Sequence, residues 1–278
     1  MGSADMRTPA GQRRELFTPL AGDKVRFSCH PDISCFTACC ADLCLVLTPY
    51  DILRMKKRLR LTAGEFIKEY TQPHEAEASA IGAGIAQAGG CAFPLIRLRM
   101  KNDERRSCPF VSRQGCAIYE DRPGACRLYP FGRAARNGFS GEEKEFYFLV
   151  NESHCLGFQE EREWTVGEWT VGEWIESQGA AIYNEMNRTW IEVVANKNVR
   201  ISSLTDQKLA MFHMASYNLD RFREFVFRTK FLKVFRLTPE EGEKVAADEV
   251  ELMKLAMRWL GFAICGLDTL ALDYPSGG

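Results

Sequence analysis

The segment CHPDISCFTACC spans residues 29–40 and carries four cysteines, Cys29, Cys35, Cys39 and Cys40. A second group follows at Cys108, Cys116, Cys126 and Cys155. Core packing does not need thiols at this density, because a buried free cysteine serves only as a small hydrophobic side chain. Thiolates are soft metal ligands. The two groups therefore predict metal binding, and metal ligation would drive the folding of the N-terminal region.

The adjacent pair Cys39 and Cys40 indicates more than one metal centre. Neighbouring Cβ atoms point roughly 100° apart in a helix and about 180° apart in a strand, so ligation of one ion by both is awkward. Eight thiolates divide into two sites of four, which suits tetrahedral zinc or four-iron (4Fe-4S) iron–sulfur clusters. The spacing does not separate these metals, because short cysteine intervals occur in both kinds of loop.

Disulfides are the main alternative for so many cysteines. The chain has 278 residues and an odd count of 11 cysteines. It also lacks the charged n-region and apolar h-region of a secretory signal, so nothing indicates an oxidising compartment. We therefore expect a cytoplasmic protein whose cysteines bind metal.

Basic residues crowd the second cysteine group. Residues 97–136 hold ten Lys or Arg and four Asp or Glu, a local excess of six positive charges, while the whole chain has a net charge of −1. A centre with four thiolates is negative and needs nearby cations once it is partly buried. A solvated loop is the alternative interpretation. Because the excess is local, a protein that coats nucleic acid is not indicated.

The chain resembles, over about residues 23–195, the bacterial cysteine-cluster proteins that are described as zinc- or iron-chelating. Near the first group the resemblance lies in FSC at 27–29, CF at 35–36, CC at 39–40 and LTPYDI at 47–52. Downstream it lies in CPF at 108–110, GCAIY at 115–119, RP at 122–123, CRLYPF at 126–131 and CLG at 155–157. The CxxCxxCC spacing of that family is stretched here to five and three intervening residues.

The resemblance implies a fold centred on the chelating cysteines, with metal ions or clusters as partners. One branch, the flagellin N-methylases, modifies lysine side chains of a protein substrate. It implies an alternative function, a protein-lysine methylase that requires S-adenosylmethionine. Cys44, Cys91 and Cys265 match nothing in the family signature, and we expect them not to be ligands.

Two histidines adjoin cluster cysteines, His30 beside Cys29 and His154 beside Cys155. Each could replace a ligand or hydrogen-bond to one. Adjacent side chains point apart in regular structure, so we expect both imidazoles to face away from the metal.

Capping signals and apolar periodicity predict most of the helices. Thr48 with Pro49 and Asp51 begins a helix over 49–60, and Thr62 with Glu65 begins one that ends near Tyr70. Further helices are expected at 172–195, 205–217, 219–235 and 239–265, and strands at 95–100 and 145–150. The helix at 172 follows an exact duplication, WTVGE at 164–168 and 169–173, which we interpret as a slipped insertion.

The segment 219–235 interleaves arginines and lysines with phenylalanines. Such a segment could bind nucleic acid. We expect instead an amphipathic helix whose phenylalanines pack on the cysteine domain. No stretch reaches the roughly 20 apolar residues that span a bilayer, so no membrane partner is expected.

The sequence thus predicts an α-rich α+β protein. We expect a disordered leader at 1–22, an irregular cysteine-cluster metal-binding core with short strands at 23–160, and a helical C-terminal region at 161–278 packed on that core.

Overall fold

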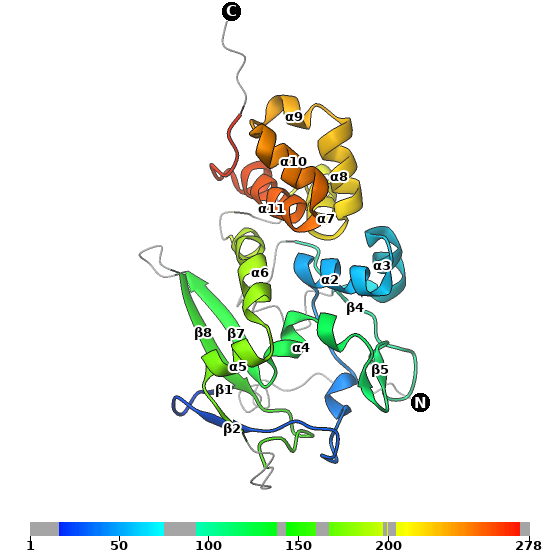
Figure 1. Cartoon of the computed structure of the whole chain (residues 1–278), viewed down its shortest axis with the longest axis vertical. Helices are drawn as coiled ribbons and strands as arrows, with labels where there is room; N and C mark the ends of the chain where they lie inside the picture. The colour runs from blue at the N-terminus through cyan, green and yellow to red at the C-terminus, as the bar shows by residue number, and fades with distance from the viewer. Residues whose placement is uncertain are drawn as a thin grey trace, which may run out of the picture.

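Helices dominate the chain and short strands surround part of them, so the predicted α-rich α+β class is confirmed (Figure 1). The computed structural model describes residues 17–74, 93–137, 143–159, 167–196, 199 and 204–272. Helices gather at the C-terminal end of the molecule, and the strands and cysteine loops lie at the other end (Figure 1).

Two short helices follow the first cysteine group. α2 spans Pro49–Leu59 and α3 spans Ala63–Tyr70. Both begin at the predicted capping boxes, because the Thr48 and Thr62 hydroxyls accept hydrogen bonds from backbone N–H groups three residues later. α3 runs into β3 (Thr71–Pro73), which pairs antiparallel with β4 (Ile96–Leu98) at the position of the predicted strand.

A three-stranded antiparallel sheet carries the end of the second cysteine group. Its order is β1-β8-β7, and β8 contains the predicted strand at 145–150. β1 belongs to the segment expected as a leader, whose first 16 residues lie outside the described part of the chain. The strands of this sheet are β1 (Phe17–Pro19), β7 (Phe131–Asn137) and β8 (Glu143–Val150). Two further antiparallel pairs of short strands are β2 (Val25–Phe27) with β9 (Gly167–Trp169), and β5 (Val111–Ser112) with β6 (Gly115–Cys116).

Three of the predicted C-terminal helices are interrupted. The helix predicted at 172–195 is α5 (Val171–Ser177) and α6 (Ala181–Val194), because Gly179 adopts a φ of +58°, which ends a helix. The helix predicted at 239–265 is α10 (Pro239–Ala247) and α11 (Glu249–Cys265), because Asp248 is extended and its side chain caps α11. The helix predicted at 219–235 is α8 (Leu219–Arg228) and α9 (Phe231–Val234), while α7 (Asp206–Tyr217) matches its prediction closely.

One hydrophobic core joins α2 and α3 to the C-terminal helices, with Leu53, Trp190, Phe212 and Leu252 among its fully buried side chains. An ion cluster reinforces this contact. The Lys56 ammonium on α2 lies 3.3 Å from Asp220 of α8 and also contacts Glu249 of α11. The regions on the two sides of the boundary predicted at residue 160 therefore share a core. The division into two domains at that residue stays a prediction.

A second, smaller core of Phe27, Phe131 and Trp174 lies beside the cysteine loops. The indole N–H of Trp174 donates to the Leu128 carbonyl at 3.1 Å, and that of Trp169 donates to the Phe27 carbonyl at 3.1 Å. Trp169 of the second repeat and Trp174, which follows it, thus tie this segment to the chain before Cys29 and to the end of the helix that carries Cys126.

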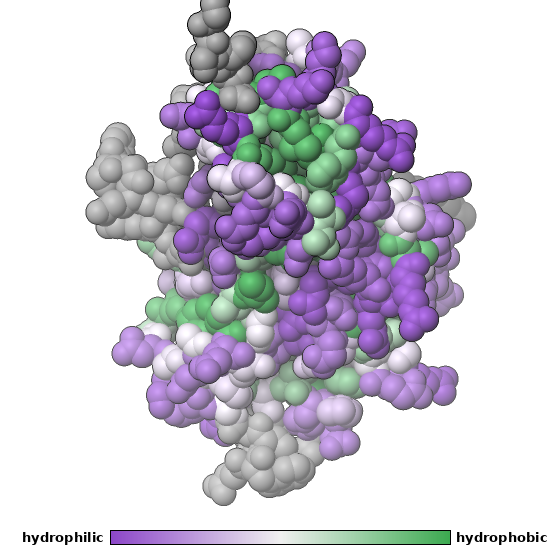
Figure 2. Space-filling model, turned by 45° about the horizontal axis from the view of Figure 1, so that its top comes forward, coloured by the Kyte–Doolittle hydropathy of each residue, from purple (hydrophilic) through white to green (hydrophobic). Residues whose placement is uncertain are grey.

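The phenylalanines of α8 and α9 pack on α11 of the helical region. Phe222, Phe225 and Phe231 surround Trp259 of α11, with centroid separations of 4.9 to 6.3 Å. The same core also contains buried side chains of α2 and α3. Hydrophilic side chains cover much of the face in Figure 2, and hydrophobic ones gather in patches between them. Among the described residues, no helix has the length and apolarity needed to cross a membrane.

Candidate metal centre

The first cysteine group lies on an irregular loop between β2 and α2. This loop contains a single 3-10 turn, η1 (Ala38–Cys40), which follows Thr37 at a φ of +64°. A left-handed residue at this point turns the chain sharply. As a result Cys39 lines a cavity that also contains Cys29 and Cys35, while the main neighbours of Cys40 besides Cys39 are cysteines of the second group.

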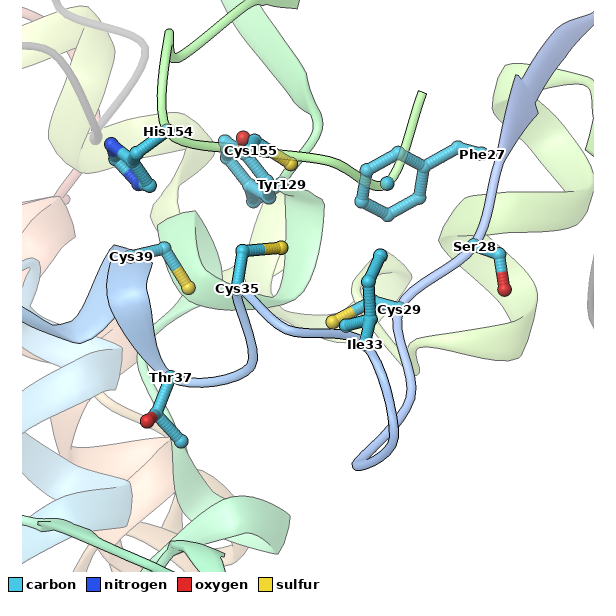
Figure 3. A pocket seen from close by; sticks show the side chains of 11 residues that line it. Phe27, Ser28, Cys29, Ile33, Cys35, Thr37, Cys39, Tyr129, His154 and Cys155 are labelled. Atoms are coloured by element: carbon cyan, nitrogen blue, oxygen red, sulfur yellow. The ribbon is translucent and has the colours of Figure 1, made fainter. Parts of the chain in front are cut away.

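Four cysteines surround this cavity, which has a volume of about 40 Å³. We call them the outer set: Cys29, Cys35, Cys39 and Cys155 (Figure 3). The backbone N–H of Leu156 donates to the Cys35 sulfur at 3.3 Å, which is the kind of contact that stabilises a thiolate. Tyr129 and His154 also line the cavity, whereas we expected the His154 imidazole to face away from the metal. His154 precedes Cys155 in a turn, where neighbouring side chains need not oppose each other as they do in a strand.

Gly157 brings the two halves of the outer set together. The Ser28 N–H donates to the Gly157 carbonyl at 3.0 Å, which joins the strand before Cys29 to the segment after Cys155. A Cβ at Gly157 would lie 2.5 Å from the Phe27 ring and 2.7 Å from the Ser28 carbonyl oxygen. Only glycine allows this approach, which explains the glycine in the CLG motif.

The other four cysteines form a second cluster, the inner set: Cys40, Cys108, Cys116 and Cys126. The Cys108 N–H donates to the Cys40 carbonyl at 2.8 Å, which fixes the two segments side by side. Cys116 is on β6, and Cys126 is on the short helix α4 (Gly124–Leu128). Burial, followed by repulsion from Cys108 and Cys116 and then from Cys39 of the outer set, raises the pKa of the Cys126 thiol.

Burial raises the pKa of five thiols in the two sets, so these thiols resist ionisation in the metal-free protein: Cys29, Cys108, Cys116, Cys126 and Cys155. Burial, followed by repulsion from Cys39, Cys155 and Cys35, raises the pKa of Cys29 to about 11. Cys39 is the exception, because a hydrogen bond from the Cys40 thiol lowers its pKa to about 7 and raises that of Cys40. A thiolate flanked by protonated thiols is a suitable first ligand for a metal cation that then displaces the remaining protons.

A buried polar network holds the loop between Cys116 and Cys126. Asp51 on α2 is 2% exposed and accepts a hydrogen bond of 2.8 Å from the Gly124 N–H at the start of α4. Arg127 donates to the Gln178 carbonyl at 2.6 Å and contacts the Glu120 carbonyl, while Arg122 donates to the Gln178 side chain at 2.6 Å. The arginines of the RP and CRLYPF motifs therefore position the loop that presents Cys126.

Cys44 and Cys265, which were expected not to be ligands, lie apart from both sets. The Cys44 sulfur is 3.7 Å from Nδ1 of His74, and the Cys265 sulfur is 4.0 Å from the Val193 carbonyl oxygen. Cys91 lies outside the described residues. The Nδ1 atom of His30 is buried, and the residue does not line the outer cavity.

The sets are clusters of neighbours without ligand geometry. In the described part of the chain, no three His, Cys, Asp or Glu side chains already have the arrangement that holds an ion. The chemistry of each set nevertheless fits a soft or borderline metal, since each offers four thiols. The Leu156 N–H donates to a thiol of the outer set, and Lys101 and Arg122 favour the thiolate forms of Cys108 and Cys116 in the inner set.

The sequence did not indicate that each set takes three cysteines from one group and one from the other. It also did not indicate the positions of Asp51, Tyr129 and Gly157 beside the two sets. The divergence of Cys39 and Cys40 was the available signal for the division. It predicted two centres, but it could not say that Cys155 belongs with the first group.

A family model matches residues 28–156 of the chain. Its description is CxxCxxCC, "putative zinc- or iron-chelating domain", and the matched region holds all eight cysteines of the two sets. Searches of curated proteins and of solved structures found no match.

Proposed function

We propose, from the zinc- or iron-chelating CxxCxxCC domain at residues 28–156, that this protein holds two metal centres. The outer centre would use Cys29, Cys35, Cys39 and Cys155, and the inner centre would use Cys40, Cys108, Cys116 and Cys126. The observation that carries this proposal is that Cys39 and Cys40, whose thiols hydrogen-bond to each other, differ in their remaining neighbours. Adjacent in sequence, they join different sets of neighbouring thiols.

Iron–sulfur clusters of the 4Fe-4S type are the occupants we favour. In two-cluster ferredoxins, three cysteines of one run bind one cluster and the fourth binds the other. We propose the same exchange here in both directions, in which Cys40 would leave the first group and Cys155 would leave the second. Such clusters supply electron transfer or, with an open iron, substrate binding. Zinc is the second candidate, because four thiolates also suit its tetrahedral coordination.

Charge compensation supports the inner centre in particular. The Lys101 ammonium lowers the pKa of the Cys108 thiol and the Arg122 guanidinium lowers that of the Cys116 thiol, each against the larger, opposite effect of burial. Each cation favours the thiolate form, which a metal needs. The basic excess of residues 97–136 thus has a role beside the second cysteine group.

The test is to purify the protein without oxygen and to measure iron, zinc and acid-labile sulfide per chain with the visible spectrum. Iron with matching sulfide and absorbance near about 400 nm supports clusters. About two zinc ions in a colourless protein would support the same eight ligands with structural zinc. Protein that stays without metal after reconstitution with either would refute both centres.

The lysine-methylase alternative rests on the resemblance of the cysteine motifs to those of the flagellin N-methylases. Calorimetric titration of the metal-loaded protein with S-adenosylmethionine tests it directly. Saturable heat would support a methylase, and no heat at high ligand concentration would remove it.

A further inference from the structure

The outer cavity offers five donors for the four positions of a tetrahedral site. Besides the four thiols of the outer set, the His154 side chain lines the cavity, on the side of Cys39 (Figure 3). Imidazole nitrogen and thiolate sulfur are both ligands for zinc, and mixed sites with three cysteines and one histidine are common. One donor of the outer set can therefore be replaced without loss of the site.

Cys29 is the donor whose place His154 can take. Cys29 and His154 are exposed residues, whereas Cys35, Cys39 and Cys155 are half-buried. The two exposed residues lie on different chain segments, after β2 and before Cys155, so each can move without the other. Cys35 is less replaceable, because the Leu156 N–H donates to its sulfur.

Charge also favours a neutral fourth ligand at the outer site. A divalent ion with four thiolates has a net charge of −2, and one with three thiolates and an imidazole has −1. The Glu152 carboxylate is negatively charged and acts to raise the pKa of the Cys39 thiol, so it adds negative charge beside the outer site. Arg122 acts on Cys29 and favours a thiolate there, so both ligand sets have some support.

We propose that His154 exchanges with Cys29 as the fourth ligand of the outer centre, which makes this centre the exchangeable one. This inference rests on the proposed two-centre function. During the exchange, after one of the two ligands has dissociated and before the other has bound, the metal has one open coordination position. A small thiol, a second metal-binding protein or a substrate could then reach the metal. The inner centre has no corresponding histidine among the described residues that act on its thiols.

The experiment is anaerobic titration of the metal-free full-length protein with Co²⁺, whose thiolate charge-transfer and d–d absorption report the ligands. The Cys29→Ser variant should still bind two Co²⁺ ions per chain, with weaker thiolate absorption. Cys29→Ser combined with His154→Ala should weaken the outer ion by more than about 100-fold, beyond the 10–100-fold cost of losing a supporting residue. The matched control, Cys29→Ser with His30→Ala, should behave like Cys29→Ser alone.

Cys35→Ser should weaken the outer ion more than Cys29→Ser does, because on this proposal His154 takes the position of Cys29 and not that of Cys35. Occupancy of the inner centre, with unchanged far-UV circular dichroism, shows in each variant that the chain is folded. The proposal is overturned if Cys29→Ser binds only one ion, or if adding His154→Ala changes nothing. The two-centre function itself would fail separately, through binding of fewer than two ions by the unsubstituted protein.

Discussion

Replacement of Asp51 should loosen the inner centre before the outer one. The carboxylate is 2% exposed and accepts three hydrogen bonds, from the Thr48 N–H at 2.9 Å, the Thr48 hydroxyl at 2.7 Å and the Gly124 N–H at 2.8 Å. Asp51→Ala removes all three and leaves two buried backbone N–H groups without this acceptor. Each such group costs about 1–3 kcal/mol, and the lost capping interaction adds about 1 kcal/mol. We expect a loss of roughly 3–7 kcal/mol in the free energy of unfolding.

Asp51→Asn should cost less, about 1–3 kcal/mol, because its amide oxygen can still accept from Gly124 while its N–H₂ group faces the Thr48 donors. The matched control is Glu65→Ala in the exposed capping box of α3, which should cost about 1 kcal/mol and leave metal binding unchanged.

The assay combines urea unfolding, followed by circular dichroism, with alkylation of free cysteines mapped by mass spectrometry. In metal-loaded Asp51→Ala, Cys116 and Cys126 should become reactive before Cys35. Reactivity of all three at the same rate would refute the reasoning, and so would a loss of stability no larger than that of Glu65→Ala.

Three further outcomes follow from the same contacts. Gly157→Ala should destabilise the protein by about 1–3 kcal/mol through collision with its neighbours, whereas Gly172→Ala in α5, which meets nothing within 4 Å, should be neutral or stabilising in thermal unfolding. Lys56→Met should cost about 1–3 kcal/mol in urea unfolding, less than a fully buried pair, because its partner Glu249 is 24% exposed; no loss would contradict the ion cluster. The Cys29 pKa is raised from 9.0 to about 11, so folding favours its neutral thiol, and the metal-free protein should be most stable below pH 9 and lose stability as the pH rises to about 11. Metal-loaded protein should lack this loss in pH-dependent unfolding, and a metal-free protein stable through pH 11 would contradict the assignment.

Local chemistry made the starts of the helices predictable. Thr48, Thr62, Thr170 and Thr238 each carry the expected partner three residues later, and each forms the reciprocal capping box. The helix interruptions were harder to predict. Gly179 and Asp248 sit within continuous apolar periodicity, and tertiary contacts decide whether such residues bend a helix or end it.

Long-range pairing accounts for the rest of what the sequence did not indicate. β7 contains Arg133 and small residues and lacks a clear alternation, so it forms a strand only through its partner β8. Likewise the membership of Cys155 in the outer set depends on the contact between Ser28 and Gly157, which are far apart in the chain. Spacing along the sequence indicates how many centres the cysteines can form, and the topology determines which cysteines share one.

The most direct test of the two-centre account compares Cys39→Ser with Cys40→Ser, each loaded with metal and treated with an alkylating reagent. Cys39→Ser should expose the outer partners Cys29, Cys35 and Cys155 while the inner cysteines stay protected. Cys40→Ser should expose Cys108, Cys116 and Cys126 while the outer cysteines stay protected. If both variants expose the same cysteines, the two groups form one site and the division proposed for them is wrong.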